Sequence, residues 1–296
     1  MKAIAALAFA GVFIAHGAVW ACSTCSCGDM TLTVMGSEKP YAGRLRAALE
    51  LRHRSDAVGT AGFNEQRLEE QRLDAQLIWA PLDRLLFMVD VPALRRTVRY
   101  VNLARRDTTA LGEIELRAKA FVYQDDAFVP AHLVALIGSV KLPTARLQRG
   151  ADGALLPIEL QPGTGSVDPG LGIAYAFFAD PWSFYASVTG VYATKGEQGY
   201  RASRSLRSTT ALQYQLIPSL ALRAGIDTRT DTTALEAGSV AADSGGFIGL
   251  ATAEALFSPF SDWLLYAAVR MPVVNALNGA HDEGAYLSVG LAYDFW

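Results

Sequence analysis

The feature that most constrains this chain is a two-residue alternation of apolar and polar side chains that repeats along most of its length. Between residues 44 and 54, one set of alternate positions holds Leu45, Ala47, Leu49 and Leu51, and the other is mostly arginine and glutamate. Side chains of a β-strand alternate between its two faces, so each such segment has one apolar and one charged face. The period predicts an all-β protein rather than a helical one.

Twelve such segments are separated by turns or loops rich in Gly, Pro, Asp and Ser. The predicted strands span residues 44–54, 67–79, 85–102, 112–123, 131–142, 166–178, 182–194, 204–216, 219–230, 246–257, 263–274 and 285–296. Short turns alternate with longer polar loops at 55–66, 103–111, 143–165, 195–203, 231–245 and 275–284. Short turns at one end and long loops at the other are typical of antiparallel transmembrane barrels in the outer membrane. Residues 44–296 are therefore predicted to form such a barrel.

The composition excludes two other classes of protein. Hydrophobic residues make up 51% of the chain, yet beyond residue 21 no apolar run approaches the ~18 residues that a membrane helix needs. A helical membrane protein is therefore excluded. The formal net charge of −3 gives no basic footprint, so no nucleic-acid partner is expected.

Aromatic residues support a barrel in a membrane over a soluble β-sandwich, which would show the same alternation. Trp79, Trp182, Trp263 and Trp296 all lie beside predicted short turns. Membrane barrels carry aromatic rings at the lipid interfaces, whereas a sandwich gives no reason for this clustering.

The last strand resembles the C-terminal insertion signal of outer-membrane proteins. Gly290 is followed by large apolar residues at alternate positions, Tyr293 and Phe295, and Trp296 adds a terminal aromatic. This pattern predicts recognition by the β-barrel insertion machinery and a place in the outer membrane of a Gram-negative bacterium.

The N-terminus is predicted to be a secretory signal peptide, residues 1–21. Lys2 supplies the positive region, residues 3–14 are apolar, and Ala21 ends a small-residue cleavage site. The alternative is a lipoprotein leader, because cleavage after Ala21 would place Cys22 at the mature N-terminus, where an acyl chain can be attached.

Residues 22–43 form a predicted periplasmic head and linker that contains all three cysteines, Cys22, Cys25 and Cys27. Three thiolates can surround Cu(I) or supply three ligands of a zinc site, so copper or zinc is the expected metal. A local disulfide between Cys22 and Cys25, with Cys27 free, is the redox alternative in an oxidising periplasm. The segment is long enough to reach the barrel mouth and to act there as a plug or gate.

Three segments carry a family resemblance: Gly112-Glu113, Lys141-Leu142-Pro143-Thr144, and the run from Gln161 to Pro169. They resemble the outer-membrane family named for the meta-cleavage pathway of phenol degradation, whose members are described as transporters. The resemblance covers roughly residues 110 to 296 and implies an outer-membrane barrel with a channel role. The family usually has Gly-Asp where this chain has Gly112-Glu113, and the cysteine head lies outside the resembling region.

The charged faces of the strands are predicted to line the barrel lumen, because the apolar faces must meet lipid. The predicted lining residues are Arg44, Arg46, Glu50, Arg52, Arg72, Asp74, Glu113, Glu115, Arg117, Lys119, Arg223 and Arg270. Charges of both signs can line a water-filled path for small solutes, or close a narrow barrel through ion pairs. The excess of arginine in the first strand favours anion passage. The pair Asp282-Glu283 is interpreted as a solvated turn.

These observations predict a monomeric outer-membrane channel or transporter for a small solute, with outer-membrane lipid as its surroundings and a metal-binding or redox-responsive cysteine head. The alternative is a closed barrel that anchors the head or docks a periplasmic partner. An outer-membrane enzyme of phospholipase type is disfavoured and no catalytic residue is expected. His132 and Ser139, seven positions apart, fall on opposite faces of one predicted strand.

Overall fold

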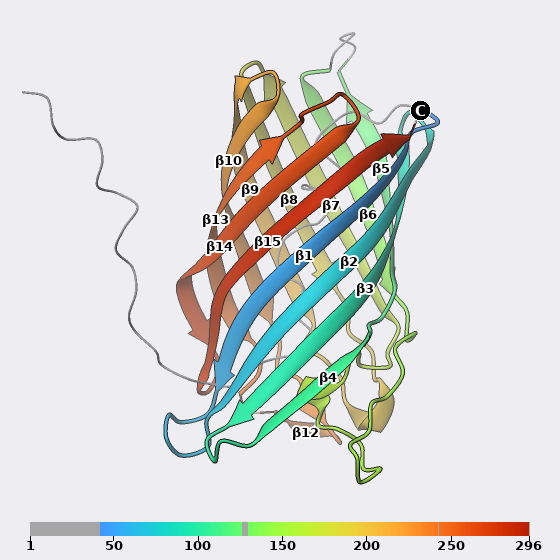
Figure 1. Ribbon diagram of the computed structural model, residues 1–296. Coiled ribbons are helices and arrows are strands. Elements are labelled where there is room, and N and C mark those ends of the chain that lie inside the picture. Colours follow the sequence, from blue (N-terminus) through green and yellow to red (C-terminus); the bar gives the residue numbers. More distant parts are fainter. Residues whose placement is uncertain (1–41, 126–129, 242, 296) are drawn as a thin grey trace, which may run out of the picture.

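A computed structural model describes residues 42–125, 130–241 and 243–295, and in these ranges the chain forms a closed antiparallel β-barrel (Figure 1). The wall contains β1 (Leu45–Val58), β2 (Gln66–Leu82), β3 (Leu85–Tyr100), β4 (Arg105–Leu111), β5 (Glu115–Gln124), β6 (His132–Lys141), β7 (Asp168–Ala179), β8 (Trp182–Val191), β9 (Ser205–Ile217), β10 (Leu220–Asp231), β13 (Gly246–Phe257), β14 (Trp263–Leu277) and β15 (His281–Phe295). Two short 3-10 turns, η1 (Ile158–Leu160) and η2 (Glu197–Gly199), and a small hairpin of β11 (Leu235–Glu236) with β12 (Ser239–Val240) lie in the connections.

The barrel closes through the pairing of its first strand with its last. β1 pairs with β15 from Leu45 opposite Phe295 to Val58 opposite His281. β4 and β5 pair one after the other with β3, so they share a single place in the wall. The described residues thus form a twelve-stranded barrel, as the alternation predicts.

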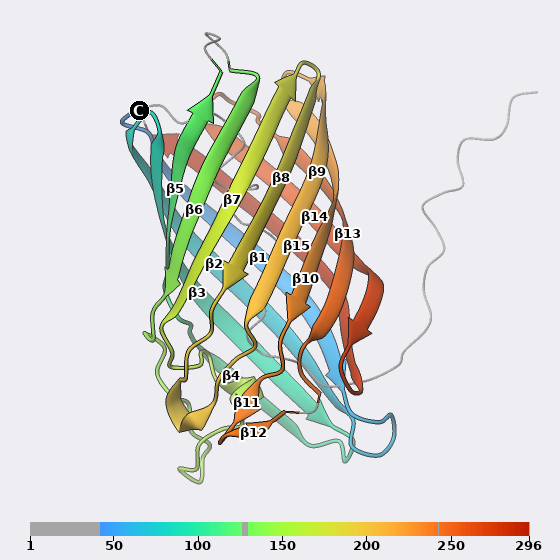
Figure 2. The ribbon, with the colours of Figure 1, turned by 180° about the vertical axis from the view of Figure 1, so that it is seen from behind.

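The two ends of the barrel differ, as the predicted loop lengths require. The C-terminus and the short turns, such as the two residues between β7 and β8, lie together at the upper end in Figure 1. β4, β11, β12 and the long connections lie at the opposite end (Figure 2). We call these the short-turn end and the loop end; in outer-membrane barrels they face the periplasm and the exterior, respectively.

Three of the predicted loops are wrong in part, because the strands continue beyond the apolar segments. β1 runs on to Val58, β4 occupies 105–111, and β14 and β15 are joined by 278–280 alone. The loop predictions relied on where hydrophobic alternation ends, which marks the edge of the lipid-facing band. Backbone pairing does not need that band, so strands with polar outward side chains extend above it.

The outer face carries the apolar side chains that the alternation predicts. Exposed large apolar residues on it include Leu49, Leu51, Leu73, Leu77, Val89, Leu136, Leu171, Ile173, Val188, Leu212, Leu222, Ile226, Leu265, Leu287 and Val289. At the short-turn end, Trp182 packs against Tyr214 with ring centroids 4.6 Å apart, and Trp263 against Tyr293 at 5.1 Å. An apolar band with an aromatic girdle is the outer surface of a membrane-spanning barrel. Among the described helices, none has the length and apolar character to cross a membrane.

The predicted insertion signal falls on β15, apart from Trp296, which lies outside the described residues. Tyr293 and Phe295 stack edge to face with centroids 4.9 Å apart on the outer side. Gly290 pairs with Tyr266 of β14, and a Cβ at this position would lie 2.3 Å from the tyrosine ring. Glycine is therefore required here because the ring of Tyr266 covers its backbone inside the barrel.

Candidate functional site: the barrel lumen

The lumen at the short-turn end is filled by apolar side chains rather than charges. One cluster of buried residues includes members from every wall strand except β4: Ala48, Ile78, Ala80, Leu86, Met88, Phe121, Leu133, Ala135, Ala176, Tyr185, Ala211, Ala221, Leu256, Tyr266 and Ala292. We call this set the apolar layer. The sequence analysis missed it, because small and aromatic residues occupy the otherwise charged inward positions near each short turn.

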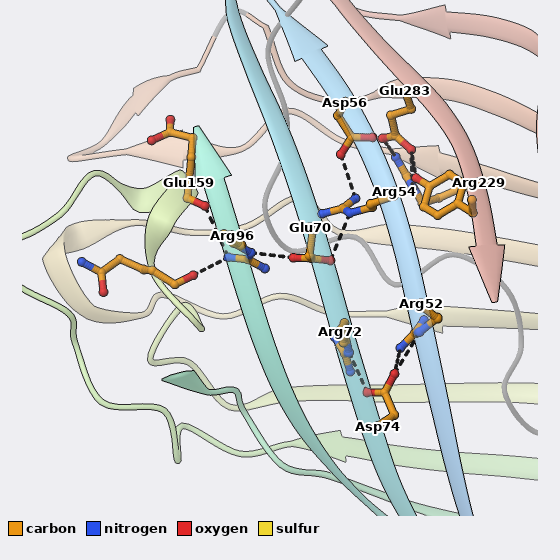
Figure 3. A network of polar contacts seen from close by, with 12 residues as sticks. Arg52, Arg54, Asp56, Glu70, Arg72, Asp74, Arg96, Glu159, Arg229 and Glu283 are labelled. Atoms are coloured by element: carbon orange, nitrogen blue, oxygen red, sulfur yellow. Dashed lines mark hydrogen bonds and ion pairs between the residues drawn. The ribbon is translucent and has the colours of Figure 1, made fainter. Parts of the chain in front are cut away.

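A belt of charged side chains follows the apolar layer toward the loop end, and its first part lies on β1, β2 and β3. Asp74, which is fully buried, accepts hydrogen bonds from Arg52 Nε at 2.9 Å and from Arg72 Nε at 2.6 Å. Arg72 also reaches Asp90 on the next strand, with Nη2 3.3 Å from Oδ2. Figure 3 shows Arg52 and Arg72 converging on Asp74. Two arginines and two carboxylates thus form one lumenal cluster.

The second part of the belt lies on β10, β13 and β14. Arg270 bridges two carboxylates, with Nε 3.1 Å from Asp227 Oδ2 and Nη2 3.3 Å from Glu254 Oε1. Arg223 Nη1 lies 3.0 Å from the other oxygen of Glu254. All four side chains are buried. Removal of one partner from a buried ion pair leaves a desolvated charge and costs about 3–5 kcal/mol, so these residues are strongly interdependent.

Nearer the loop end, Glu70 joins the arginines of two neighbouring strands (Figure 3). It accepts hydrogen bonds from Arg54 Nε at 3.1 Å and from Arg96 Nε at 2.5 Å. Arg54 also pairs with Asp56, with Nη1 3.1 Å from Oδ2. This network continues the charged belt to the level where the loops begin.

Glu283 corrects the interpretation of Asp282-Glu283 as a solvated turn. Its side chain is 1% exposed, pairs with Arg229, and accepts a hydrogen bond from the Tyr286 hydroxyl. The turn between β14 and β15 lies beyond it, so Glu283 belongs to the strand and points into the lumen. Asp282 is exposed, as expected.

The long connection between β6 and β7, residues 142–167, folds against the inner side of the wall. Glu113 accepts a hydrogen bond from the backbone N–H of Gly165 at 2.6 Å. Lys141 Nζ lies between two carboxylates, 2.5 Å from Glu113 and 2.7 Å from Asp168. Arg96 donates to the backbone carbonyl of Gln161. Side chains of the charged belt therefore hold this loop at the mouth of the lumen.

The loop itself is tightly packed. Gln161 is 1% exposed and donates to the Leu156 carbonyl at 2.8 Å while accepting from the Gln148 N–H at 2.8 Å. At Gly163 a Cβ would lie 2.4 Å from the Glu113 side chain, so a residue without a side chain is required for this approach. Burial in the same loop raises the pKa of the Glu159 carboxyl above its ordinary value. The segment that carries the family resemblance is thus a structured lumenal loop.

Two adjoining cavities lie within the charged belt. The larger, about 100 Å³, is bounded by the loop and by Arg96, Lys141 and Arg207. The smaller, about 40 Å³, reaches Arg207, Asp227 and Arg229. A water molecule needs roughly 10–15 Å³ of such space, so these polar cavities have room for several waters. The described lumen therefore has a charged chamber with room for water between the apolar layer and the loop at its mouth.

Most of the predicted lining residues lie in this chamber or beside it, but two lie at the opposite rim. Arg52, Arg72, Asp74, Glu113, Glu115, Arg117, Arg223 and Arg270 belong to the belt or line its cavities. Arg44 and Arg46 both pair with Asp294 at the short-turn end, with Nε–Oδ1 distances of 3.1 and 2.8 Å. Glu50 is buried, and Lys119 Nζ lies 5.4 Å from the centre of the Phe121 ring.

Seven further residues organise the chamber, and the sequence did not lead us to predict a lumenal role for them: Glu70, Asp90, Arg96, Lys141, Asp168, Glu254 and Glu283. The first six are charges on the inward parity of a predicted strand, so the alternation contained the signal for them. Glu283 lies in the predicted loop 275–284, and only the observed strand length places it inside.

The histidine and serine considered for catalysis lie on opposite faces of β6. His132 faces outward, with Nδ1 2.8 Å from the Tyr175 hydroxyl, and Ser139 lines both cavities. Cys22, Cys25 and Cys27 lie outside the described residues, so the predicted metal or redox site stays a prediction.

Comparison with known proteins finds similar folds among solved structures. No family model and no curated protein sequence matches the chain. The fold is similar to the crystal structure of an outer-membrane channel from Pseudomonas putida F1, with a TM-score of 0.67, 14% identity, and coverage of 87% of this chain and 97% of that chain. The translocator domain of the autotransporter NalP from Neisseria meningitidis gives a TM-score of 0.49, 12% identity, and coverage of 88% and 90%. The NanC porin gives 0.48 and 9%, with coverage of 83% and 100%.

The geometry around Lys141 predicts that it fixes the loop at the mouth. Lys141→Met should leave Glu113 and Asp168 as two buried carboxylates without their shared cation, and so loosen residues 142–167. We expect proteinase K to cut this loop severalfold faster in refolded protein than in the wild type. Lys141→Arg, which keeps the charge, should behave as the wild type. Equal cutting rates for all three proteins would show that the ion pairs do not hold the loop.

Proposed function

We propose that this protein is a channel for small polar or charged solutes in the outer membrane of a Gram-negative bacterium. The observation that carries the proposal is a charged chamber with room for water inside a closed barrel with an apolar outer face. A barrel that served as an anchor alone would need no space between its buried charges, since packed side chains can fill a lumen completely. The similar fold of the channel from Pseudomonas putida supports the same proposal.

The apolar layer is the barrier in this channel. A charged solute loses hydration as it passes between apolar side chains, and short hydrophobic constrictions gate pores by excluding water. The belt above the layer presents both arginines and carboxylates, so it can solvate ions of either sign before that step. Several arginines of the belt form ion pairs with the same carboxylates. The preference for anions that the arginines of the first strand suggest therefore depends on the net charge of all the side chains that line the chamber.

The second candidate is a closed barrel that anchors the N-terminal head or docks a periplasmic partner. The dense ion pairs favour it, because clusters such as Arg223, Glu254 and Arg270 join neighbouring strands across the inner wall. Conductance separates the two candidates, since an anchor carries no current.

We further propose that residues 1–21 direct export and that residues 22–43 form a copper- or zinc-binding or redox-responsive head and linker in the periplasm. The proposal rests on the spacing of the three cysteines. The described chain begins at the short-turn end, where Ala42 N donates to Asp83 Oδ1 at 2.8 Å and Gly43 N to the Ala80 carbonyl at 2.8 Å. We also propose, from the resemblance of residues 110–296, that the chain is a member of the phenol meta-cleavage family of outer-membrane transporters.

Tyr185 gives the sharpest test of the channel, because it is among the largest side chains of the apolar layer and is 1% exposed. Tyr185→Ala should widen the layer and raise single-channel conductance in planar bilayers severalfold above the wild type. Phe184→Ala, a neighbouring aromatic on the lipid side, should leave conductance unchanged. If folded wild type and Tyr185→Ala were both silent, the anchor would replace the channel as the better account.

The cysteine head is tested by its metal content. Refolded mature protein, reduced and then equilibrated with zinc or Cu(I), should retain about one ion per chain after dialysis, and the variant with all three cysteines changed to serine should retain none. Thiol titration without reductant reports the redox alternative, in which a Cys22–Cys25 disulfide leaves Cys27 free. Equal metal content in both proteins, together with three free thiols in the wild type, would contradict both versions of the proposal.

A further inference from the structure

The outer wall has an open apolar groove over β7, β8, β9 and the end of β10, close to the loop end. Its volume is about 530 Å³ and its lining is largely apolar, with Pro169, Leu171, Gly190, Tyr192, Arg204 and Leu206 among its residues. It opens away from the lumen, on the face that meets lipid. The wall alone separates it from the larger lumenal cavity, since Val191, Ser205 and Asp231 line both, and the groove has no part in the proposed permeation path.

Glycine at position 190 creates the floor of this groove. Gly190 pairs with Leu171 on one side and with Leu206 on the other, so the three residues form one row across the outer face. Leu171 is 77% and Leu206 is 55% exposed, and both stand above the bare glycine backbone. The row therefore forms a slot between two leucine walls, of a width suited to a hydrocarbon chain.

A cation stands at the loop end of the slot. The guanidinium carbon of Arg204 lies 3.9 Å from the centre of the Tyr192 ring, and Nη2 donates to the Tyr192 hydroxyl at 2.6 Å. Its Nε is buried and has no hydrogen-bond partner among the described residues. Among the residues that line the groove, Arg204 is the one basic side chain, so the rim carries a cation. Asp231 lines the groove as well, but its carboxylate is buried against Arg229.

The groove lies at the depth of the outer leaflet. On β8, Trp182 marks the aromatic girdle at the short-turn end, and Tyr192 follows ten residues later on the same face. Ten residues of a strand tilted by about 40° rise roughly 25 Å, which matches the height of the apolar band of such barrels. Arg204 and Tyr192 therefore lie at the outer interface, with the apolar slot directly beneath them in the hydrocarbon.

We propose that this groove binds lipopolysaccharide, with one acyl chain of lipid A in the slot and a lipid A phosphate on Arg204. The occupant must be an amphiphile with a hydrocarbon chain and an anionic head, because the slot is apolar and its rim carries a cation. Arginine is well suited to a phosphate, which offers several acceptor oxygens to its N–H groups. Lipid A, the phosphorylated glycolipid of the outer leaflet, has its acyl chains in the hydrocarbon and its phosphates at the outer interface, as the slot and Arg204 require.

The test uses native mass spectrometry of the full mature chain, refolded in detergent and titrated with lipid A. We expect one tightly bound lipid A per barrel, with at least tenfold weaker binding of lipid A from which the phosphates have been removed. Gly190→Leu should fill the slot and weaken binding at least tenfold. The fold should tolerate this change, because a Cβ at Gly190 has no heavy atom nearer than 3.9 Å.

Two further variants control the experiment. Gly138→Leu places the same side chain on the lipid face of β6, where a Cβ meets nothing within 4 Å, and should bind lipid A as the wild type does. Arg204→Gln should bind both forms of lipid A equally, because it retains the slot and loses the cation. Full binding by Gly190→Leu would overturn the proposal, as would an undiminished preference for phosphorylated lipid A in Arg204→Gln. Equal binding of phosphatidylglycerol would also overturn it, since that lipid has two acyl chains on glycerol, one phosphodiester and no glycan.

Discussion

The structure depends on one constraint: a chain that crosses hydrocarbon as strands must pair every backbone N–H and C=O group within the sheet. An open edge in lipid leaves unsatisfied groups at several kcal/mol each, so the sheet has to close. Here the pairing of β1 with β15, through thirteen of the fourteen residues of β1, completes the ring. Between β4 and β5 the wall is interrupted toward the loop end, where the Thr144 hydroxyl accepts a hydrogen bond from the Ile114 N–H at 2.8 Å.

Closure also decides where the charges go. Side chains alternate between the two faces of each strand, so an apolar outer face places the polar side chains in a lumen of limited width. Carboxylates and guanidiniums that are buried there form ion pairs with one another. The result is a chain of shared ion pairs, from Asp74 with Arg52 and Arg72 to Glu254 with Arg223 and Arg270. Such pairs hold neighbouring strands together, and the space that they leave has room for water. The same network therefore accounts for stability and for a polar interior.

Alternation was enough to predict the barrel, its strand number and the inward position of residues such as Arg72, Asp74 and Arg270. It was not enough to predict the apolar layer, because Tyr185 and Tyr266 read equally well as interfacial aromatics from sequence. It also ended the strands at 44–54 and 263–274 too early and began the last strand too late, which assigned Glu283 to a solvated turn; that side chain is buried against Arg229. Hydrophobic patterning marks the boundary of the lipid, whereas strand length depends on backbone pairing. The ion pairs between side chains of different strands depend on how the closed barrel brings those strands together, which the sequence pattern does not specify.

We infer that water enters the charged chamber and is excluded from the apolar layer. This division of the lumen can be measured by the reaction of single cysteines, in a background without Cys22, Cys25 and Cys27, with a membrane-impermeant maleimide added from outside. Ser187→Cys, beside the smaller cavity, should react, and Ala211→Cys, in the apolar layer, should not. Rapid reaction at Ala211→Cys would show that water fills the lumen through the apolar layer, and would contradict the account.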